Sequence, residues 1–396
     1  MASSRGFDRF SPNTPDAPYF AIKIEDRIYD IDINYIESIT VQRVWNKVGN
    51  FNFTIVNAAD LNLENKFLKL LQAYDSEFPP ISFQYGWSLG AKSPWYRGWL
   101  ENYNPEFMPG GYMRLGVSGQ LLSLEETEPV IKAYKGNKMS DIVAGIAEDQ
   151  GWIIEDLEQS ETLKEPYHAN LTNVDIIDYI DKTILPKTYN SKKEPFKFYF
   201  ETGDNGQTHI WFVSVNKQVG SYKPYNYYIN FGNFGSVLQW APHYTATEVR
   251  GQLQSAIFDL DTNDICVYGN EAKAASRGGN TLTVYGATSP DAMGPLLANK
   301  WYENCIAALK ASLTIVGDPT LVPYQFINVL PFEAPGSDGN GGSRLHRFTS
   351  GTYYIQQIND TLGADYQTQL ELVSLGTDAP QTNMPLEEAV TFKGKE

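Results

Sequence analysis

Apolar and polar residues alternate along much of the first third of the chain, and this period-two pattern predicts β-strands. The alternation predicts strands over 19–24, 28–33, 36–45, 51–56, 81–85, 95–103 and 112–122. One stretch, 61–71, instead spaces its leucines and Phe67 at helical intervals. We therefore expect residues 18–127 to form a first β domain that carries one helix.

After residue 127 the apolar spacing becomes helical. Ser140 is placed to cap a helix that Gly151 ends, and the apolar face of this helix consists of Ile142, Val143, Ile146 and Ala147. A second helical pattern begins at Thr172 and ends before Pro186. We interpret residues 128–195 as a small α-containing domain.

Strand patterns return in the remainder of the chain. They predict strands over 196–200, 209–215, 312–316, 325–332, 352–359 and 366–374. Between them, residues 246–309 mix short strands with a helix over about 290–311, which Ser289 caps. We expect a second β domain made of 196–245 and 310–376, interrupted by an inserted α/β segment at 246–309. The polar, proline-containing ends, 1–17 and 377–396, are expected to be flexible arms.

Two hairpin patterns resemble each other. In one, Gly98 opens a strand and Tyr112 opens the next; in the other, Gly351 and Tyr366 hold these places. A further strand precedes each hairpin, at 81–85 and at 325–332. Two interpretations remain open: an internal duplication, or the general likeness of any two hairpins. A duplication would place two similar β domains at either end of the α-containing material.

Composition and charge narrow the classes of function. The chain has 396 residues, enough for about two to four domains. Its net charge of −16 disfavours adhesion to nucleic-acid phosphates or anionic membranes. Cys266 and Cys305 stand far apart in apolar contexts, which is typical of free thiols in a reducing compartment. The content of 13% aromatic residues and 32 glycines agrees with the interpretation that the chain is mainly β.

The familiar motifs of catalysis and cofactor binding are missing from the sequence. There is no Gly-x-Ser-x-Gly, His-Glu-x-x-His or Walker motif. The glycine-rich stretch 335–344 is typical of a hairpin tip, and 259–264 begins like a calcium loop but has Asn270 at the twelfth position. The acidic run 125–128 lacks the spatial pairing that glycoside hydrolysis needs. We therefore expect no catalytic residue, no bound cofactor and no metal ion.

Two other classes of function stay open beside a structural role. A glycan hydrolase would need a cleft with a carboxylate pair at about 5–10 Å. A glycan-binding module would need an exposed aromatic platform, for which Trp87, Trp95 and Trp99 are candidates. Core and interface packing explains these tryptophans equally well.

The stretch 301–330 carries the strongest resemblance to a known family. It reads as an alanine-rich helix, a strand, the turn Gly317-Asp-Pro, then Leu321-Val-Pro323 and a second strand. With the whole layout of 18–376, this resembles the central hub proteins of contractile phage tails and the hub part of type VI secretion spikes. One position departs from that pattern, because Tyr324 stands where the family usually has glycine.

The resemblance implies a fold and a mechanical function. The fold would be mainly β with α/β inserts, containing two tail-tube-like antiparallel β-barrel domains and smaller α-containing domains. Three chains would form a ring that joins a hexameric tail tube to a trimeric central spike in the virion baseplate, beside other baseplate proteins. DNA or other cargo would pass through the channel without specific binding, with acidic walls repelling phosphates.

Candidate partner-binding residues lie in two loops. The first is the turn 104–111, with Phe107 and Gly110; the second is the glycine-rich loop 334–347, with Gly336, Gly342 and Arg344. We predict that these loops touch the tail tube or the spike.

Overall fold

A computed structural model gives the fold. It describes residues 17–24, 27–45, 47–56, 63–73, 79–109, 112–122, 129–134, 138–159, 167–172, 196–203, 205–214, 225–230, 236–244, 254–259, 264–269, 309–323, 325–333, 344–346 and 349–374. Most of these residues belong to antiparallel strands, which confirms the mainly β prediction.

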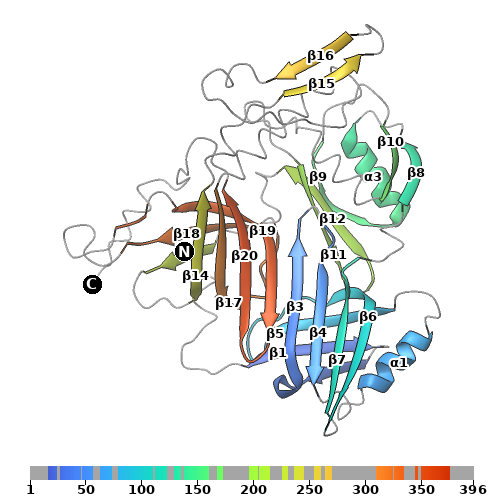
Figure 1. Ribbon diagram of the computed structural model, residues 1–396, viewed down its shortest axis with the longest axis vertical. Coiled ribbons are helices and arrows are strands. Elements are labelled where there is room, and N and C mark those ends of the chain that lie inside the picture. The colour runs from blue at the N-terminus through green and yellow to red at the C-terminus, as the bar shows by residue number, and fades with distance from the viewer. Residues whose placement is uncertain are drawn as a thin grey trace.

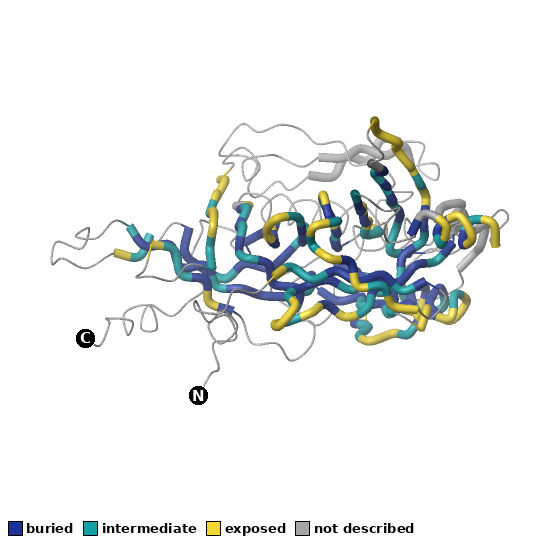
Figure 2. The backbone as a smooth tube through the Cα atoms, turned by 90° about the horizontal axis from the view of Figure 1, so that it is seen from below, coloured by how far each residue is buried: buried dark blue, intermediate teal, exposed yellow. Residues whose placement is uncertain are grey.

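Eight strands lie side by side and form the main surface of the molecule (Figure 1). Their order across the sheet is β14, β17, β20, β19, β3, β4, β7, β6. Their bounds are β14 Val237–Tyr244, β17 Leu309–Val316, β20 Tyr366–Ser374, β19 Gly351–Leu362, β3 Ile36–Val44, β4 Asn50–Val56, β7 Tyr112–Gln120 and β6 Tyr96–Met108. Figure 2 shows the buried segments concentrated along the middle of this layer, with exposed segments at turns and strand ends.

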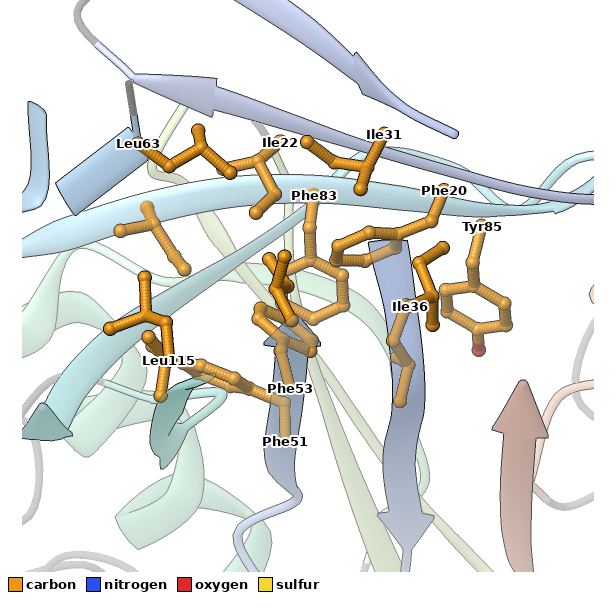
Figure 3. Close-up of a cluster of buried hydrophobic side chains, with 14 of the residues drawn as sticks. Phe20, Ile22, Ile31, Ile36, Phe51, Phe53, Leu63, Phe83, Tyr85 and Leu115 are labelled. Carbon is orange, nitrogen blue, oxygen red and sulfur yellow. The ribbon is translucent and has the colours of Figure 1, made fainter. Parts of the chain in front are cut away.

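The first β unit comprises β1 to β7 and folds its sheet back on itself. The start of β6 pairs with β5 (Pro80–Trp87), and its longer second part pairs with β7. Beyond β5 follow β1 (Pro18–Ile24) and β2 (Arg27–Ile31). Figure 3 shows side chains of the crossing layers meeting in the core, such as Phe20, Phe53 and Phe83. The rings of Phe20 and Phe53 have centroids 4.8 Å apart. Helix α1 (Leu63–Ala73) adds Leu63, Phe67 and Leu70 to this core, as the helical spacing predicts.

The second β unit is built from β13, β14 and β17 to β20. Strands β13 (Tyr225–Ile229) and β18 (Phe326–Pro331) pair in parallel, and β18 pairs with the first residues of β19. Its core contains Leu313, Ile327 and Leu370. Because β19 also pairs with β3, the two units share one 13-stranded sheet. Within this shared sheet, the strands of each unit fold over a hydrophobic core of their own.

The two units repeat the same order of strand pairing. In the first unit, β3, β4, β7 and β6 lie side by side in this order, and β5 pairs with the start of β6. In the second unit, β14, β17, β20 and β19 lie side by side in this order, and β18 pairs with the start of β19. Each unit has two β-bulges at matching places. In the bulge on the first strand of each layer, the extra residue is Glu37 of β3 in the first unit and Leu238 of β14 in the second. In the bulge on the last strand, it is Glu101 of β6 in the first unit and Gln356 of β19 in the second.

The matching bulges align the two units residue by residue. The pair Thr54–Gly116, which joins β4 and β7, then corresponds to the pair Thr314–Gln369, which joins β17 and β20. The registers of these inner strand pairs therefore agree as well. The repeat suggested by sequence thus exists in the pairing, but two of its residue matches were wrong. Gly98 corresponds to Tyr353 rather than to Gly351, and Met113 rather than Tyr112 corresponds to Tyr366. A shared glycine or tyrosine is a weaker register marker than a bulge, because a bulge changes which residues face each other.

A smaller unit packs beside the junction of the two β units. Helix α3 (Met139–Gln150) covers a sheet in which β12 (Thr208–Ser214) lies between β11 (Phe196–Thr202) and β9 (Ile153–Leu157). Strands β11 and β12 therefore share a sheet with β9 rather than with strands of the second β unit. Gly151 ends the helix with φ 70°, as expected. Ser140 was wrongly predicted as its cap: Lys138 holds that place without a side-chain hydrogen bond, and Ser140 is buried inside the helix.

Two separate two-stranded sheets complete the described strands. They pair β8 (Pro129–Tyr134) with β10 (Tyr167–Thr172), and β15 (Gln254–Asp259) with β16 (Asp264–Gly269). A 3₁₀ turn, Ile33–Tyr35, precedes β3. The helix predicted after Thr172 and most of the one over 290–311 lie outside the described residues, but β17 already begins at Leu309. No helix within the described ranges is both long and apolar enough to cross a membrane.

Candidate functional site

One face of the eight-strand layer is covered with amide and hydroxyl side chains, and we call it the amide face. Because strand residues alternate between faces, each core residue is followed by a residue on this outer side. Cross-strand partners line up in rows that run through both β units. One row consists of Gln239, Thr314, Gln369, Asn359, Gln42, Asn50 and Gln120; another consists of Gln367, Thr361, Thr40, Asn52, Ser118 and Asn102.

Several of these side chains hydrogen-bond to one another. Asn50 Nδ2 donates to Gln42 Oε1 at 2.7 Å, and Gln357 Nε2 donates to Asn359 Oδ1 at 3.0 Å. Gln369 Nε2 donates to Ser312 Oγ at 3.1 Å. Amides that satisfy one another in this way hold fewer donors ready for a passing ligand.

Few charges interrupt the amide face within the described strands. Partial burial raises the pKa of the Glu371 carboxyl. Near the distal end of β6, Arg114 forms ion pairs with Glu37 and with Glu106, the latter at 3.3 Å. Among the described strand residues of this face, neutral polar groups therefore outnumber charged ones.

The pairing of β3 with β19 joins the two β units, and a buried ion pair lies behind it. Arg43 and Asp360 are 1% and 0% exposed, and Arg43 Nη2 lies 3.0 Å from Asp360 Oδ2. Arg43 Nη1 also donates to Leu321 O at 2.8 Å and to Tyr96 Oη at 2.9 Å. Because one guanidinium contacts both units, it fixes their relative position.

Asp360 is saturated with donors from both units. Tyr85 Oη donates at 2.7 Å, Tyr366 Oη at 3.0 Å and Thr368 Oγ1 at 2.6 Å. Burial raises the pKa of both tyrosines, which keeps their hydroxyl groups protonated as donors. These three hydrogen bonds and the ion pair with Arg43 replace the contacts with water that the buried carboxylate lacks.

The turn that carried the sequence resemblance lies against this joint. Trp87 Nε1 of the first unit donates to Gly317 O at 2.8 Å, and Gly317 N donates to Tyr366 O at 2.9 Å. A Cβ at Gly317 would stand 2.2 Å from the ring of Tyr366, so only glycine fits. Tyr324 lies outside the described residues.

The eight-strand layer ends in two edges. At one, β14 pairs only with β17 among the described strands; at the other, the part of β6 beyond Trp99 extends past β5. Each edge contains one proline, Pro242 in β14 and Pro105 in β6. Both edges expose large apolar side chains: Tyr244 is 40% exposed and Phe107 is 72% exposed.

The sequence-predicted partner residues fall at separate places. Phe107 lies near the tip of the β6–β7 hairpin, whereas Arg344 is exposed beside the second unit, where its carbonyl oxygen accepts from Glu333 N at 2.7 Å. Gly110, Gly336 and Gly342 lie outside the described residues. The sequence reading did not single out Arg43 and Asp360, since two single charges 317 residues apart carry no local signal.

Three observations concern the residues of the other candidate chemistries. They contain no cluster of three or more His, Cys, Asp or Glu side chains that would hold a metal ion. Trp87 packs against Tyr366 with ring centroids 5.3 Å apart, so it serves the joint rather than a flat glycan platform. The acidic run 125–128 lies outside the described ranges.

Three solved structures share this fold over most of their length. A tail protein from Neisseria meningitidis MC58 aligns with a TM-score of 0.57 and 10% identity, covering 92% of this chain and 98% of that one. A 43 kDa tail protein of prophage MuSo2 from Shewanella oneidensis aligns at 0.55 and 11%, covering 92% and 100%. An Escherichia coli component of the type VI secretion system, described as structurally similar to the T4 tail proteins gp27 and gp5, aligns at 0.51 and 11%, covering 92% and 79%.

These likenesses show that the chain has the fold of tail proteins. They confirm, at the level of the fold, the resemblance that the stretch 301–330 indicated. No family model matches the sequence, and no curated protein matches it either.

Proposed function

We propose that the protein is a structural hub of a phage tail baseplate or of a related contractile injection system. One observation carries the proposal: two β units with the same pairing order form one continuous layer that is polar on its outer face and ends in two edges. A layer of this kind is suited to being continued by further copies into a ring. The shared fold with tail proteins supports the same reading.

The ring would contain three chains. Two similar units per chain then give six units around the axis, which matches a hexameric tail tube on one side, while the threefold symmetry matches a trimeric spike on the other. The protein would reside in the virion baseplate, in contact with other baseplate proteins. Its role would be mechanical, so no substrate turnover is expected.

The amide face would line the central passage. Side chains that are neutral and hydrogen-bonded to one another offer phosphates neither a counter-charge nor many unused donors. DNA or other cargo would therefore pass without specific binding. The tip at Phe107 and the loop before Arg344 would contact the tube or the spike, so deleting 334–347 should spare folding and weaken co-assembly.

Native mass measurement combined with negative-stain imaging tests the ring. We expect a three-chain particle with a central opening, formed either by the chain alone at high concentration or after mixing with tail-tube protein. A chain that stays monomeric in both preparations would contradict the proposal. Hydrolysis of peptidoglycan by the purified chain would contradict the mechanical role separately.

A further inference from the structure

The internal joint predicts how two copies of the chain meet. We propose that β6 of one copy pairs with β14 of a second copy, in the register that β19 and β3 use within the chain. The proposal relies on the proposed function only for the presence of a second copy. The register itself comes from the repeated pairing and its bulges.

The bulge alignment assigns each edge residue a counterpart in the closed joint. On β6, Tyr103, Pro105 and Phe107 correspond to Ile358, Asp360 and Leu362 of β19. On β14, Trp240, Pro242 and Tyr244 correspond to Ile39, Val41 and Arg43 of β3. The closed joint pairs Ile358 with Arg43, Asp360 with Val41, and Leu362 with Ile39. The copied joint therefore pairs Tyr103 with Tyr244, Pro105 with Pro242, and Phe107 with Trp240.

All six of these side chains belong to the side of the layer that faces the core. Trp240 packs against Tyr353 with ring centroids 5.5 Å apart, and the ring centroids of Tyr103 and Phe67 are 6.1 Å apart. In this register Phe107, 72% exposed in the single chain, comes to lie beside Trp240. Cross-strand aromatic pairs are among the favourable ones. We call these three pairs the aromatic seam.

The opposite side of the copied joint continues the amide face. Asn104 corresponds to Asn359, and His243 corresponds to Gln42, which are paired in the closed joint. Asn104 of one copy then faces His243 of the next, so a polar pair spans the copied joint on this side of the layer. The same register thus satisfies both sides of the layer.

The two prolines make the seam weaker than the joint inside the chain. A proline in a strand is tolerated where its nitrogen faces away from the neighbouring strand, so both nitrogens face the open edges. When the strands pair as proposed, two backbone donors are missing at the centre of the seam. The closed joint has Asp360 and Val41 at this place, and both of these residues have an N–H. A ring assembled this way would separate between chains before it separated within one.

Cysteine pairs test the register directly. The test variant carries Asn104→Cys and His243→Cys in a Cys266→Ser, Cys305→Ser background. The control shifts the register by two residues, with Asn104→Cys and Ala241→Cys. Directly opposite residues of a non-hydrogen-bonded pair have Cβ atoms about 4.5–5.5 Å apart, within small adjustments of disulfide geometry. We expect oxidation to link the test variant into covalent multimers and to leave the control mostly unlinked, with native mass measured on both and on the background.

Each outcome separates the seam from the proposed function. Linking of the control in preference to the test variant overturns the register. A three-chain particle with no linking in either variant overturns the seam and leaves the hub function standing. Linked open chains that never close keep the seam and contradict the ring. A background protein that remains monomeric both alone and with tail-tube protein overturns both.

Discussion

The joint between β3 and β19 and the pair of edges on β6 and β14 occupy the same place in a repeated pattern, yet they are built from different chemistry. Inside the chain, Arg43 and Asp360 are buried and held by hydroxyl groups of both units. At the edges, the corresponding residues are Tyr244 and Pro105. The charged pair has been replaced by an aromatic ring and an imino acid.

The two surfaces lose their contact with water at different times, and this accounts for the difference in their residues. The closed joint is buried once, as the chain folds, and there a saturated ion pair specifies one arrangement. In the proposed seam, an edge has to remain soluble in the free chain and pair with a second copy later. Tyrosine, proline and one exposed phenylalanine tolerate water, whereas an unpaired charge destined for burial would have to lose its hydration at each association.

Breaking the closed joint should have the largest effect. Arg43→Ala leaves the Asp360 carboxylate buried without its cation, and we expect the free energy of unfolding to fall by about 3–5 kcal/mol. Urea denaturation of the single chain measures this. The paired change Arg43→Met with Asp360→Asn should recover part of the loss, because it removes both charges and keeps an amide oxygen that accepts from Tyr366 and Thr368. If Arg43→Ala alone costs less than about 1 kcal/mol, the ion pair does not hold the two units together.

The edge should respond differently to loss of its exposed aromatic residue. Phe107→Ser should leave the unfolding free energy of the single chain within about 0.5 kcal/mol, since the side chain is 72% exposed. Chain–chain association should weaken by about 2 kcal/mol, or roughly 30-fold, because an aromatic anchor is lost. Analytical ultracentrifugation measures the association. Ile28→Ser, which removes another exposed apolar side chain, on β2, is the matched control and should not alter association.

The positions of the strands could be predicted from the sequence far better than the joint between β3 and β19. Alternation located most of the strands because each has one buried face, and Gly151 ended its helix as the pattern required. The pairing of β3 with β19 joins residues more than 300 positions apart, and no local period reports it. The amide face could not be predicted from the sequence either. In each single strand its glutamines and asparagines resemble ordinary solvent-exposed residues, and only the register between strands aligns them in rows. Phe107 was found because an apolar residue beside a proline–glycine turn is conspicuous, and its role as a partner contact stays a prediction.

Restoring the missing donors should strengthen the seam. Pro105→Val combined with Pro242→Val supplies two backbone N–H groups directed at the partner strand, each worth about 0.5–1.5 kcal/mol net. Greater freedom of the unfolded chain offsets part of any gain in monomer stability, so the measure is the dissociation rate of the assembly rather than its melting temperature. We expect dissociation to slow about tenfold. Unchanged or faster dissociation would mean that the proline nitrogens do not face a partner strand.

Alkaline pH should loosen the closed joint. Burial raises the pKa of Tyr85 above its ordinary value near 10. The unfolded chain therefore loses this proton first, and stability present below about pH 10 declines as pH rises toward the folded-state pKa. The expected decline is about 1.4 kcal/mol per pH unit for each such tyrosine. Tyr85→Phe should flatten the stability profile above about pH 10 by that amount, and an unaltered slope would show that Tyr85 ionises freely in the folded chain.

The smallest effect should come from the exposed ion pairs at the distal end of β6. Arg114 bridges Glu37 and Glu106, but the three side chains are 38%, 42% and 58% exposed. Glu37→Gln should therefore lower the free energy of unfolding far less than Arg43→Ala does, and the loss should shrink further in high salt. Comparing it with Arg43→Ala under the same conditions contrasts a solvated arginine pair with a buried one in a single protein. A salt-independent loss of several kcal/mol for Glu37→Gln would mean that the β6 edge is held as tightly as the joint inside the chain.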